Sequence, residues 1–178
     1  MKDNWMLIAV IVLAGFTIIT PFVEGRMRKK LLDELAELLM SGRLDEFDQI
    51  ANTKKAKRLI RPFNLDFMKL NGAIMKGNKE EIEACLDRFE NVRLNTEQKS
   101  AVYNRAFYYY LTNAETEKAE TYYKRIAENR KEDLNDEVER LYDTYVLGGF
   151  KYLQQTEEAW EQASENMKPT LEALLAKM

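Results

Sequence analysis

Apolar residues recur at helical spacing from residue 27 to the end of the chain. Between residues 27 and 40, for example, Leu31, Leu35 and Leu38 fall on one face of a helix with 3.6 residues per turn. No stretch alternates apolar and polar residues over five or more positions, as a half-buried strand does. The pattern therefore predicts an all-α fold.

Capping residues and helix breakers divide this pattern into helices. Gly42, Pro62 and Gly77 are expected to end helices, and Thr112 with Glu115 has the form of a capping box that starts one. The second helix either ends at residue 51 or continues to residue 60, and the helix that begins near residue 136 either breaks at Gly148–Gly149 or passes through them. The predicted helices are 27–40, 44–51, 65–75, 79–89, 96–111, from the Thr112 cap to 129, from 136 onward, 156–163 and a short last helix that begins at Pro169.

The breaks recur at a nearly constant interval. They fall at Gly42, at Gly77, at Asn113–Ala114 and near residues 154–156, with separations of 35, 36–37 and about 40 residues. A period of this length with two helices per unit is typical of an array of helical hairpins. One hairpin cannot bury its apolar stripe alone, so stacking of neighbours is the physical reason for repetition. We expect about four hairpins and a terminal helix.

The chain resembles the tetratricopeptide-repeat (TPR) family, most clearly in the third unit. That unit has large, aromatic and small residues where the family pattern places them, at Tyr103, Tyr110, Ala119, Tyr123 and Ile126. The first unit matches at Leu31, Leu38 and Gly42 but has Phe47 where the family has a small residue. The second matches at Gly77 and has Ile82 at the small position, and the fourth fits through Gly149 and Tyr152 or through Ala159. The resemblance implies a solenoid of antiparallel helical hairpins that binds a protein or peptide.

An uncharged segment precedes the helical pattern. Residues 5–23 carry no charge, and nineteen residues in a helix span roughly 28 Å, close to the ~30 Å hydrocarbon core of a bilayer. Trp5 stands where an interfacial aromatic would lie, and the basic residues Arg26, Arg28, Lys29 and Lys30 follow the segment. Basic residues mark the cytoplasmic side, so we expect a single-pass membrane protein with its N-terminus outside and its C-terminal domain in the cytoplasm.

This segment has two other interpretations. A cleaved signal peptide would have a stronger basic start than Lys2 and a small-residue cleavage site, which Val23 and Gly25 supply poorly. The third interpretation is a buried apolar helix. We predict a transmembrane anchor in residues 1–25 and a TPR-like domain in residues 26–178.

Composition removes most kinds of chemistry. The 178 residues contain no histidine and one cysteine, Cys85. Histidine-based nucleophile systems, histidine-ligated metals, intramolecular disulfides and cysteine-rich metal sites are thereby excluded. Cys85 lies on an apolar stripe, where we expect a buried small hydrophobe. The glutamates at 157, 158, 161 and 165 lack the histidines that helical di-metal sites use, so we expect a solvated face. The sequence predicts no cofactor, no metal and no catalytic activity.

Basic residues are concentrated near the uncharged segment. Residues 24–62 hold ten basic and seven acidic side chains, including a second cluster formed by Lys54, Lys55, Lys57, Arg58 and Arg61, whereas residues 63–178 carry a net charge of −6. Anionic lipids attract such segments, which favours a domain held close to the inner leaflet. The alternative is a solvated helix face that follows the topology rule. The acidic remainder would repel phosphate, so we expect no nucleic acid partner.

All nine tyrosines lie between residues 103 and 152. Successive residues of a helix point about 100° apart, so Tyr108, Tyr109 and Tyr110 cannot all be buried on one face. The TPR resemblance places Asn104 and Tyr108 on the concave surface, and we expect a partner to contact Asn71, Asn104, Tyr108 and Tyr145. The alternative is that each tyrosine fills space between stacked helices.

These observations predict a membrane-anchored scaffold that holds a protein or peptide partner at the cytoplasmic face. The alternative is a structural or assembly subunit of a membrane complex, recruited through its transmembrane helix. Ala14 and Gly15 would allow close helix packing, but there is no second glycine at the spacing of a small-residue dimer motif.

Overall fold

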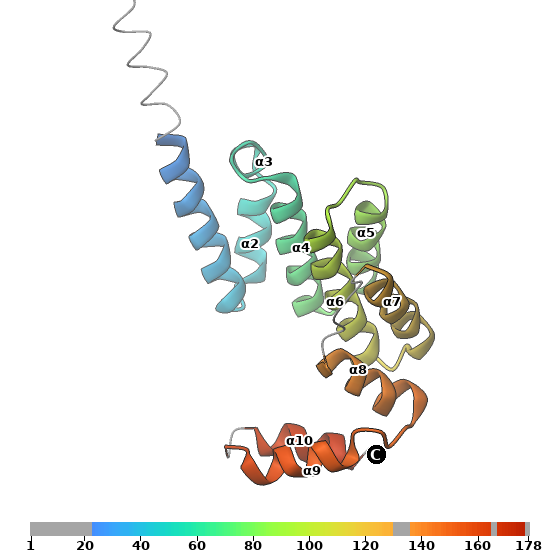
Figure 1. Cartoon of the computed structure of the whole chain (residues 1–178). Helices are drawn as coiled ribbons and strands as arrows, with labels where there is room; N and C mark the ends of the chain where they lie inside the picture. The colour runs from blue at the N-terminus through green and yellow to red at the C-terminus, as the bar shows by residue number, and fades with distance from the viewer. Residues whose placement is uncertain (1–22, 130–135, 165–166, 177–178) are drawn as a thin grey trace, which may run out of the picture. The chain divides into compact units, whose positions relative to one another are not determined.

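The computed structural model describes residues 23–129, 136–164 and 167–176, and these are helical apart from short connections (Figure 1). No strand occurs within these three ranges, so the all-α prediction is confirmed. The chain forms two compact units, residues 1–88 and 89–178. Each unit is described below by itself.

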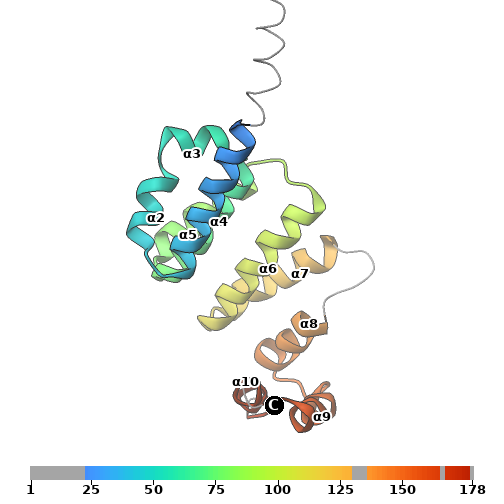
Figure 2. The same cartoon turned by 90° about the vertical axis from the view of Figure 1, so that its left-hand side faces the viewer.

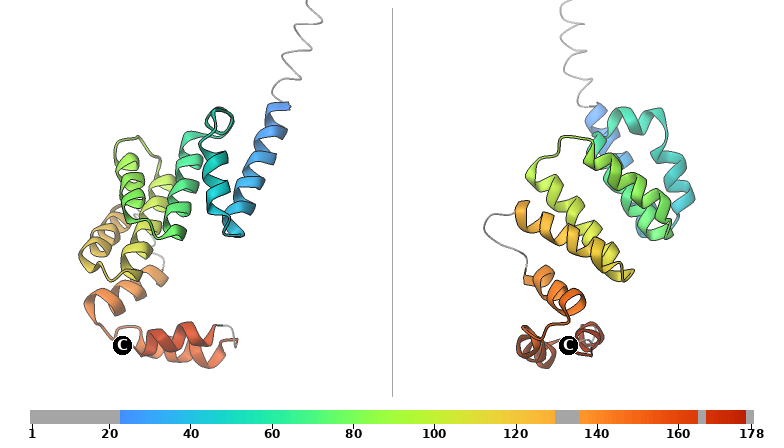
Figure 3. Two further views of the ribbon diagram at one scale, coloured as in Figure 1. Left: turned by 180° about the vertical axis from the view of Figure 1, so that it is seen from behind. Right: turned by 90° about the vertical axis from the view of Figure 1, so that its right-hand side faces the viewer.

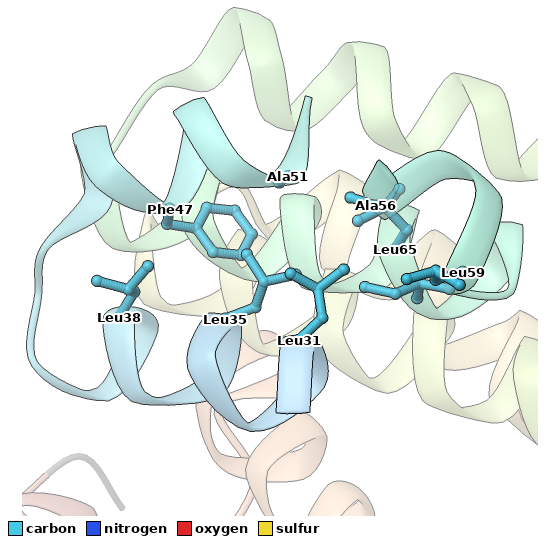
Figure 4. Close-up of a cluster of buried hydrophobic side chains, with 9 residues drawn as sticks. Leu31, Leu35, Leu38, Phe47, Ala51, Ala56, Leu59 and Leu65 are labelled. Carbon is cyan, nitrogen blue, oxygen red and sulfur yellow. The ribbon is translucent and has the colours of Figure 1, made fainter. Parts of the chain in front are cut away.

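The first unit begins with a helix over residues 23–40, which forms a hairpin with α2 (Leu44–Ala51). The short helix α3 (Lys54–Leu59), α4 (Pro62–Lys76) and most of α5 (Lys79–Glu90) follow. The core is made by Leu31, Leu35, Leu38, Phe47, Ala51, Ala56, Leu59, Ile60 and Leu65 (Figure 4). Leucines of the first helix thus pack between α2 on one side and α3 on the other.

The structure decides between the two alternatives for the second helix, which ends at Ala51. A separate helix α3 starts at Lys54 and is capped by Thr53, whose hydroxyl accepts a hydrogen bond from the backbone of Ala56 at 3.1 Å. The first helix starts at residue 23, four residues before the predicted start. Pro62 begins α4 as well as following the end of α3, whereas we expected the next helix to start at residue 65. Proline lacks a backbone donor, but the first residues of a helix need none, so it fits there.

In the second unit, α6 (Thr96–Thr112) and α7 (Thr116–Asn129) pack side by side as an antiparallel hairpin (Figure 2). Then come α8 (Asp136–Tyr142), a π-helical turn η1 (Asp143–Leu147), α9 (Leu153–Gln162) and α10 (Lys168–Leu175). Both α8 and η1 contact α7, and α9 packs beside α10 (Figure 3). The predicted start of α9 at residue 156 was three residues late.

The predicted capping box at Thr112 is wrong. Thr112 is the last residue of α6, and its hydroxyl donates to the carbonyls of Tyr108 and Tyr109 in its own helix. A capping box does form at the start of α6, where the Asn95 side chain accepts from the backbone of Gln98 and the Gln98 side chain accepts from the backbone of Asn95.

A residue with left-handed backbone lies at or near each predicted break between helices. Gly42, Gly77 and Gly148 have φ values of 71°, 66° and 63°, and Ala114 has a φ of 57°. Glycine adopts this conformation without a Cβ penalty, which explains why it recurs where a helix must stop and the chain must turn back. The fourth break therefore lies at Gly148 and not near residues 154–156, and the interval stays between 34 and 37 residues. This regularity supports a helical-hairpin repeat, although the repeat type stays a prediction.

Most of the predicted anchor, residues 1–25, lies outside the described residues, because Trp5 and the other residues up to 22 belong to the part that is not described. Its last three residues, 23–25, form the start of the 23–40 helix. Among the helices that are described, none is both long enough and apolar enough to cross a bilayer. The basic residues that follow the anchor segment, Arg26, Arg28, Lys29 and Lys30, are exposed on the 23–40 helix.

Candidate functional site

The second unit contains an open groove of about 570 Å³ between α6, α8, η1 and α10. Its lining combines apolar side chains with two tyrosines and one side chain of each charge. The lining residues are Tyr108, Leu111, Thr112, Glu137, Arg140, Leu141, Tyr145, Met167, Thr170 and Leu171. A mostly apolar cleft with a few polar groups is the usual form of a binding site, and this volume lies within the ordinary range of about 300–1,000 Å³.

The run of three tyrosines in α6 is divided between core and groove. Tyr109 and Tyr110 are buried and their rings meet edge to face at 5.1 Å, while Tyr110 stacks on Tyr122 of α7 at 5.6 Å. Tyr108 is only half-buried and lines the groove. The expectation that one member of the run must leave the core is confirmed, because the helical rotation of about 100° per residue turns Tyr108 toward α8.

Tyr108 of α6 and Glu137 of α8 both line the groove, and the Glu137 carboxylate acts on the titration of the Tyr108 phenol. Burial of the phenol, together with the negative charge and the hydrogen bond of Glu137, raises the pKa of Tyr108 to about 12. All of these effects oppose the phenolate form. At neutral pH the groove therefore presents a protonated phenol beside the Glu137 carboxylate.

The π-helical turn η1 positions Tyr145 opposite Tyr108. It ends at Gly148 and is followed by Gly149, where a Cβ would lie 2.5 Å from a carboxylate oxygen of Asp143. That carboxylate also accepts a hydrogen bond from the backbone of Lys151 at 3.2 Å. Single π-helical turns are rare and occur frequently at functional sites. The Gly148–Gly149 pair therefore breaks the helix and lets Asp143 hold the turn that presents Tyr145.

A layer of aromatic rings joins the helices beneath the groove. Phe107 is fully buried and packs edge to face against Tyr108 at 5.6 Å and at a tilt against Tyr123 at 6.4 Å. Tyr123 of α7 stacks on Tyr142 of α8 with 3.7 Å between ring centroids. Such contacts add about 0.5–1.5 kcal/mol each beyond their area burial. This layer fixes α8 and η1 against the α6–α7 hairpin.

The structure brings together two of the four residues predicted to contact a partner. Tyr108 and Tyr145 both line the groove. Asn104 lies one turn before Tyr108 on α6, and its buried amide oxygen has no hydrogen-bond partner among the described residues, but its side chain does not line the groove. Asn71 belongs to α4 of the first unit, where its amide donates to the Phe67 carbonyl of the same helix at 3.0 Å.

Several groove residues were missed by sequence reasoning, notably Arg140 and the residues Met167, Thr170 and Leu171 around α10. The spacing of Met167 and Leu171 by four residues is a signal for one helix face, but it does not say which helix that face meets. Only the packing of α8 and α10 in space places them beside Tyr108.

The lone cysteine takes the structural role predicted for it. Cys85 is 1% exposed, and burial raises the pKa of its thiol, with the Arg88 guanidinium donating to the sulfur at 2.9 Å. A protonated, buried thiol is a weak nucleophile. Within the described ranges, no group of three or more acidic or cysteine side chains is arranged to hold a metal ion.

The titration of Tyr108 gives a direct test of this site. The ordinary pKa of tyrosine is about 10, so the native-state value of about 12 makes Tyr108 stabilise the fold fully below pH 10 and lose that contribution as the pH rises to 12. Replacing Tyr108 by Phe should remove one phenolate step near pH 12 from the ultraviolet absorbance titration of the folded protein.

Replacing Glu137 by Gln should move that step to lower pH without removing it, because the charge is lost while burial of the phenol remains. In guanidinium all nine phenols should titrate near pH 10. If the step that Tyr108→Phe removes from the folded protein lay near pH 10 and not near pH 12, Tyr108 would have an ordinary pKa, and its described burial beside Glu137 would be wrong.

No protein-family model, curated protein or solved structure matches the chain.

Proposed function

We propose that the protein is a membrane-anchored interaction module that holds a segment of a partner protein in the Tyr108–Tyr145 groove at the cytoplasmic face of a membrane. In this proposal the helical hairpins form a TPR-like scaffold, and the mechanism is recognition without a chemical step. The observation that carries it is the groove, in which two tyrosines predicted to contact a partner lie together.

The groove has the chemistry of a peptide site. Tyrosine offers a large, rigid contact surface that loses little conformational entropy on binding, together with a hydroxyl at its tip, and it is enriched at protein interfaces. Leu111, Leu141 and Leu171 supply apolar wall, and Met167, 54% exposed, supplies a side chain that adapts to irregular shapes. A groove of about 570 Å³ accommodates a few side chains of a partner rather than a whole domain face.

Arg140 indicates the charge of the occupant. It is half-buried at the groove, and among the described residues it forms no ion pair. Glu137, the acidic residue of the lining, is engaged by Tyr108. A half-buried guanidinium favours a carboxylate, which it binds through two parallel hydrogen bonds. We therefore expect an apolar peptide segment that carries an acidic side chain or a terminal carboxylate opposite Arg140.

The location of the proposed module rests on the sequence of residues 5–30. An uncharged run of membrane-spanning length is followed by Arg26, Arg28, Lys29 and Lys30, and this order favours a cytoplasmic location for the remainder of the chain. Protease added to the outside of intact cells should leave a C-terminal tag on the full chain intact, and digestion of that tag would overturn this orientation.

A photo-crosslinking experiment in native membranes tests the groove. A benzophenone amino acid at position 145 should yield crosslinks to one defined peptide of a partner, identified by mass spectrometry. The same amino acid at position 99 serves as the control, because Lys99 is exposed on α6 outside the groove lining. Crosslinks at position 99 but not at position 145 would overturn the proposal.

The identified peptide then allows a binding measurement with the full-length protein. Tyr145→Ala should weaken binding at least about 10-fold, because aromatic anchors of interfaces contribute 2 kcal/mol or more when truncated. Arg140→Gln should weaken the binding of a peptide whose carboxylate is intact. It should leave the binding of the analogue with an amide in place of that carboxylate unchanged. Thr121→Ala, an exposed change on α7, is the matched control and should bind as the wild type does.

The assembly-subunit alternative predicts a different dependence on the anchor. Residues 5–23 can be replaced by an unrelated apolar segment of equal length, which keeps the chain in the membrane and changes every potential helix–helix contact there. Survival of the crosslink at position 145 assigns recognition to the groove. Loss of the complex after this exchange, with the protein still in the membrane, would favour recruitment through the transmembrane segment.

A further inference from the structure

Two basic clusters that are 24 residues or more apart in the sequence lie at the same end of the first unit. The first cluster, Arg26, Arg28, Lys29 and Lys30, occupies the N-terminal turns of the 23–40 helix, and the second, Lys54, Lys55, Lys57, Arg58 and Arg61, occupies α3 and its end. In each of Figures 1–3, α3 lies at the end of the unit where the 23–40 helix begins. We call these nine side chains the basic face.

Buried contacts between the helices hold the two clusters together. Leu31 of the first helix belongs to the same core cluster as Ala56 and Leu59 (Figure 4), which also includes Ile60. Met27 is packed against that cluster. Met27 lies between Arg26 and Arg28 in the sequence, and Leu59 follows Arg58. The apolar side chains Met27 and Leu59 face the core, whereas their basic neighbours Arg26, Arg28 and Arg58 are exposed at the surface.

All nine basic side chains are exposed. Arg28, Lys29 and Lys30 of the first cluster form no ion pair with any described residue, and the same holds for all five members of the second cluster. Acidic residues are scarce there: Glu24 is the acidic residue of the 23–30 stretch, and α3 has none. Lys54 and Lys55 occupy the first turn of α3, where the helix dipole disfavours positive charge. Residues that disfavour their own helix, as these lysines do, are expected at positions where function has taken precedence over stability.

Resting on the membrane anchoring of the proposed function, we propose that the basic face lies against the anionic headgroups of the membrane that the uncharged segment enters. The face stands at the point where residues 5–22 join the described structure, so an anchored chain would present it to the lipid surface. Each Lys or Arg near an anionic surface strengthens binding by roughly 5-fold, and the effect extends over about 8 Å at physiological salt. The uncharged segment would hold the chain at the membrane, and the basic face would in addition orient the first unit on the lipid surface.

The test uses the full-length protein bound to lipid vesicles, either zwitterionic or containing anionic phosphatidylglycerol. Acetylation of Lys54, Lys55 and Lys57 by an amine-reactive reagent is followed by mass spectrometry, with the exposed Lys99 of the second unit as an internal reference. We expect acetylation of the α3 lysines to be at least about 5-fold slower on anionic vesicles than on zwitterionic vesicles. This difference in rate should disappear in high salt. Acetylation of Lys99 should be the same on both.

A matched pair of variants separates position from total charge. Lys54→Gln with Lys57→Gln and Arg58→Gln removes three charges from the basic face and should abolish the protection of Lys29 and Lys30 on anionic vesicles. Arg93→Gln with Lys99→Gln and Lys124→Gln removes three exposed charges elsewhere and should leave that protection unchanged. These substitutions are all at exposed sites, so both variants should keep the wild-type far-ultraviolet circular dichroism.

Three results would overturn the proposal. The first is equal acetylation of the α3 lysines on both kinds of vesicle while the chain is bound to both, whereas failure of the chain to associate with either kind would overturn the membrane anchoring on which the inference rests. The second is an equal loss of protection in the control variant. The third is protection of these lysines by a short DNA duplex at low micromolar concentration but not by anionic vesicles, which would assign the face to nucleic acid instead.

Discussion

Replacing Phe47 by alanine is expected to lower the free energy of unfolding of the first unit by about 3–5 kcal/mol. Phe47 is fully buried between the 23–40 helix and α4, at a position where the resemblance to TPR proteins predicts a small residue. Truncation leaves a cavity that the surrounding leucines cannot fill completely. Amide hydrogen exchange of peptides from residues 31–51, measured on the full-length protein, should rise accordingly, while Met40→Ala, 88% exposed, should change little.

The large ring fits because α4 has a glycine opposite it. A Cβ added at Gly72 would lie 3.1 Å from Cε1 of Phe47 and 3.5 Å from Cδ2 of Leu39. Alanine normally stabilises a helix interior by roughly 0.5–1 kcal/mol relative to glycine. Gly72→Ala should therefore stabilise the first unit when Phe47 is replaced by Leu. In the wild-type background the same substitution should stabilise the first unit less, or destabilise it. An equal gain in both backgrounds would contradict a close contact between Phe47 and Gly72.

Replacing Phe107 by alanine should destabilise the second unit by a similar amount, about 3–5 kcal/mol, and should also disturb the groove. Phe107 is fully buried, and its ring contacts Tyr108 at the groove and Tyr123 of the ring stack that holds α8. We expect faster hydrogen exchange in α6 and α7 and a lower pKa of Tyr108, because its phenol becomes more accessible to water.

Two comparisons make this prediction specific. Phe107→Leu keeps most of the apolar volume and should cost less than the alanine substitution. Phe150→Ala makes the same truncation at a residue that is 63% exposed, and it should change stability by no more than about 0.5 kcal/mol. If Phe107→Ala altered hydrogen exchange no more than Phe150→Ala does, the aromatic layer would not support the groove as described.

The helices themselves could be predicted from the sequence because their signals are local. The apolar spacing around Leu35, the Asn95 cap and the glycines at 42 and 77 each act within one or two turns, and the structure has helices that begin or end at these points. The same local reasoning failed at Thr112, whose hydroxyl bonds to its own helix instead of starting the next one. A threonine can make either bond, and its neighbours in sequence do not decide between them.

The sequence by itself determined the helical class, the period near 35 residues, the concentration of positive charge in residues 24–62 and the exit of one tyrosine of the run from the core. Tertiary structure decided which distant residues meet: Tyr108 with Glu137 and Tyr145, Phe47 with Gly72, and the two basic clusters at one end of the first unit. Helix formation depends on residues three and four apart, whereas these encounters depend on how whole helices pack against one another. The pattern along one helix shows that it has an apolar face, and only packing shows what that face meets.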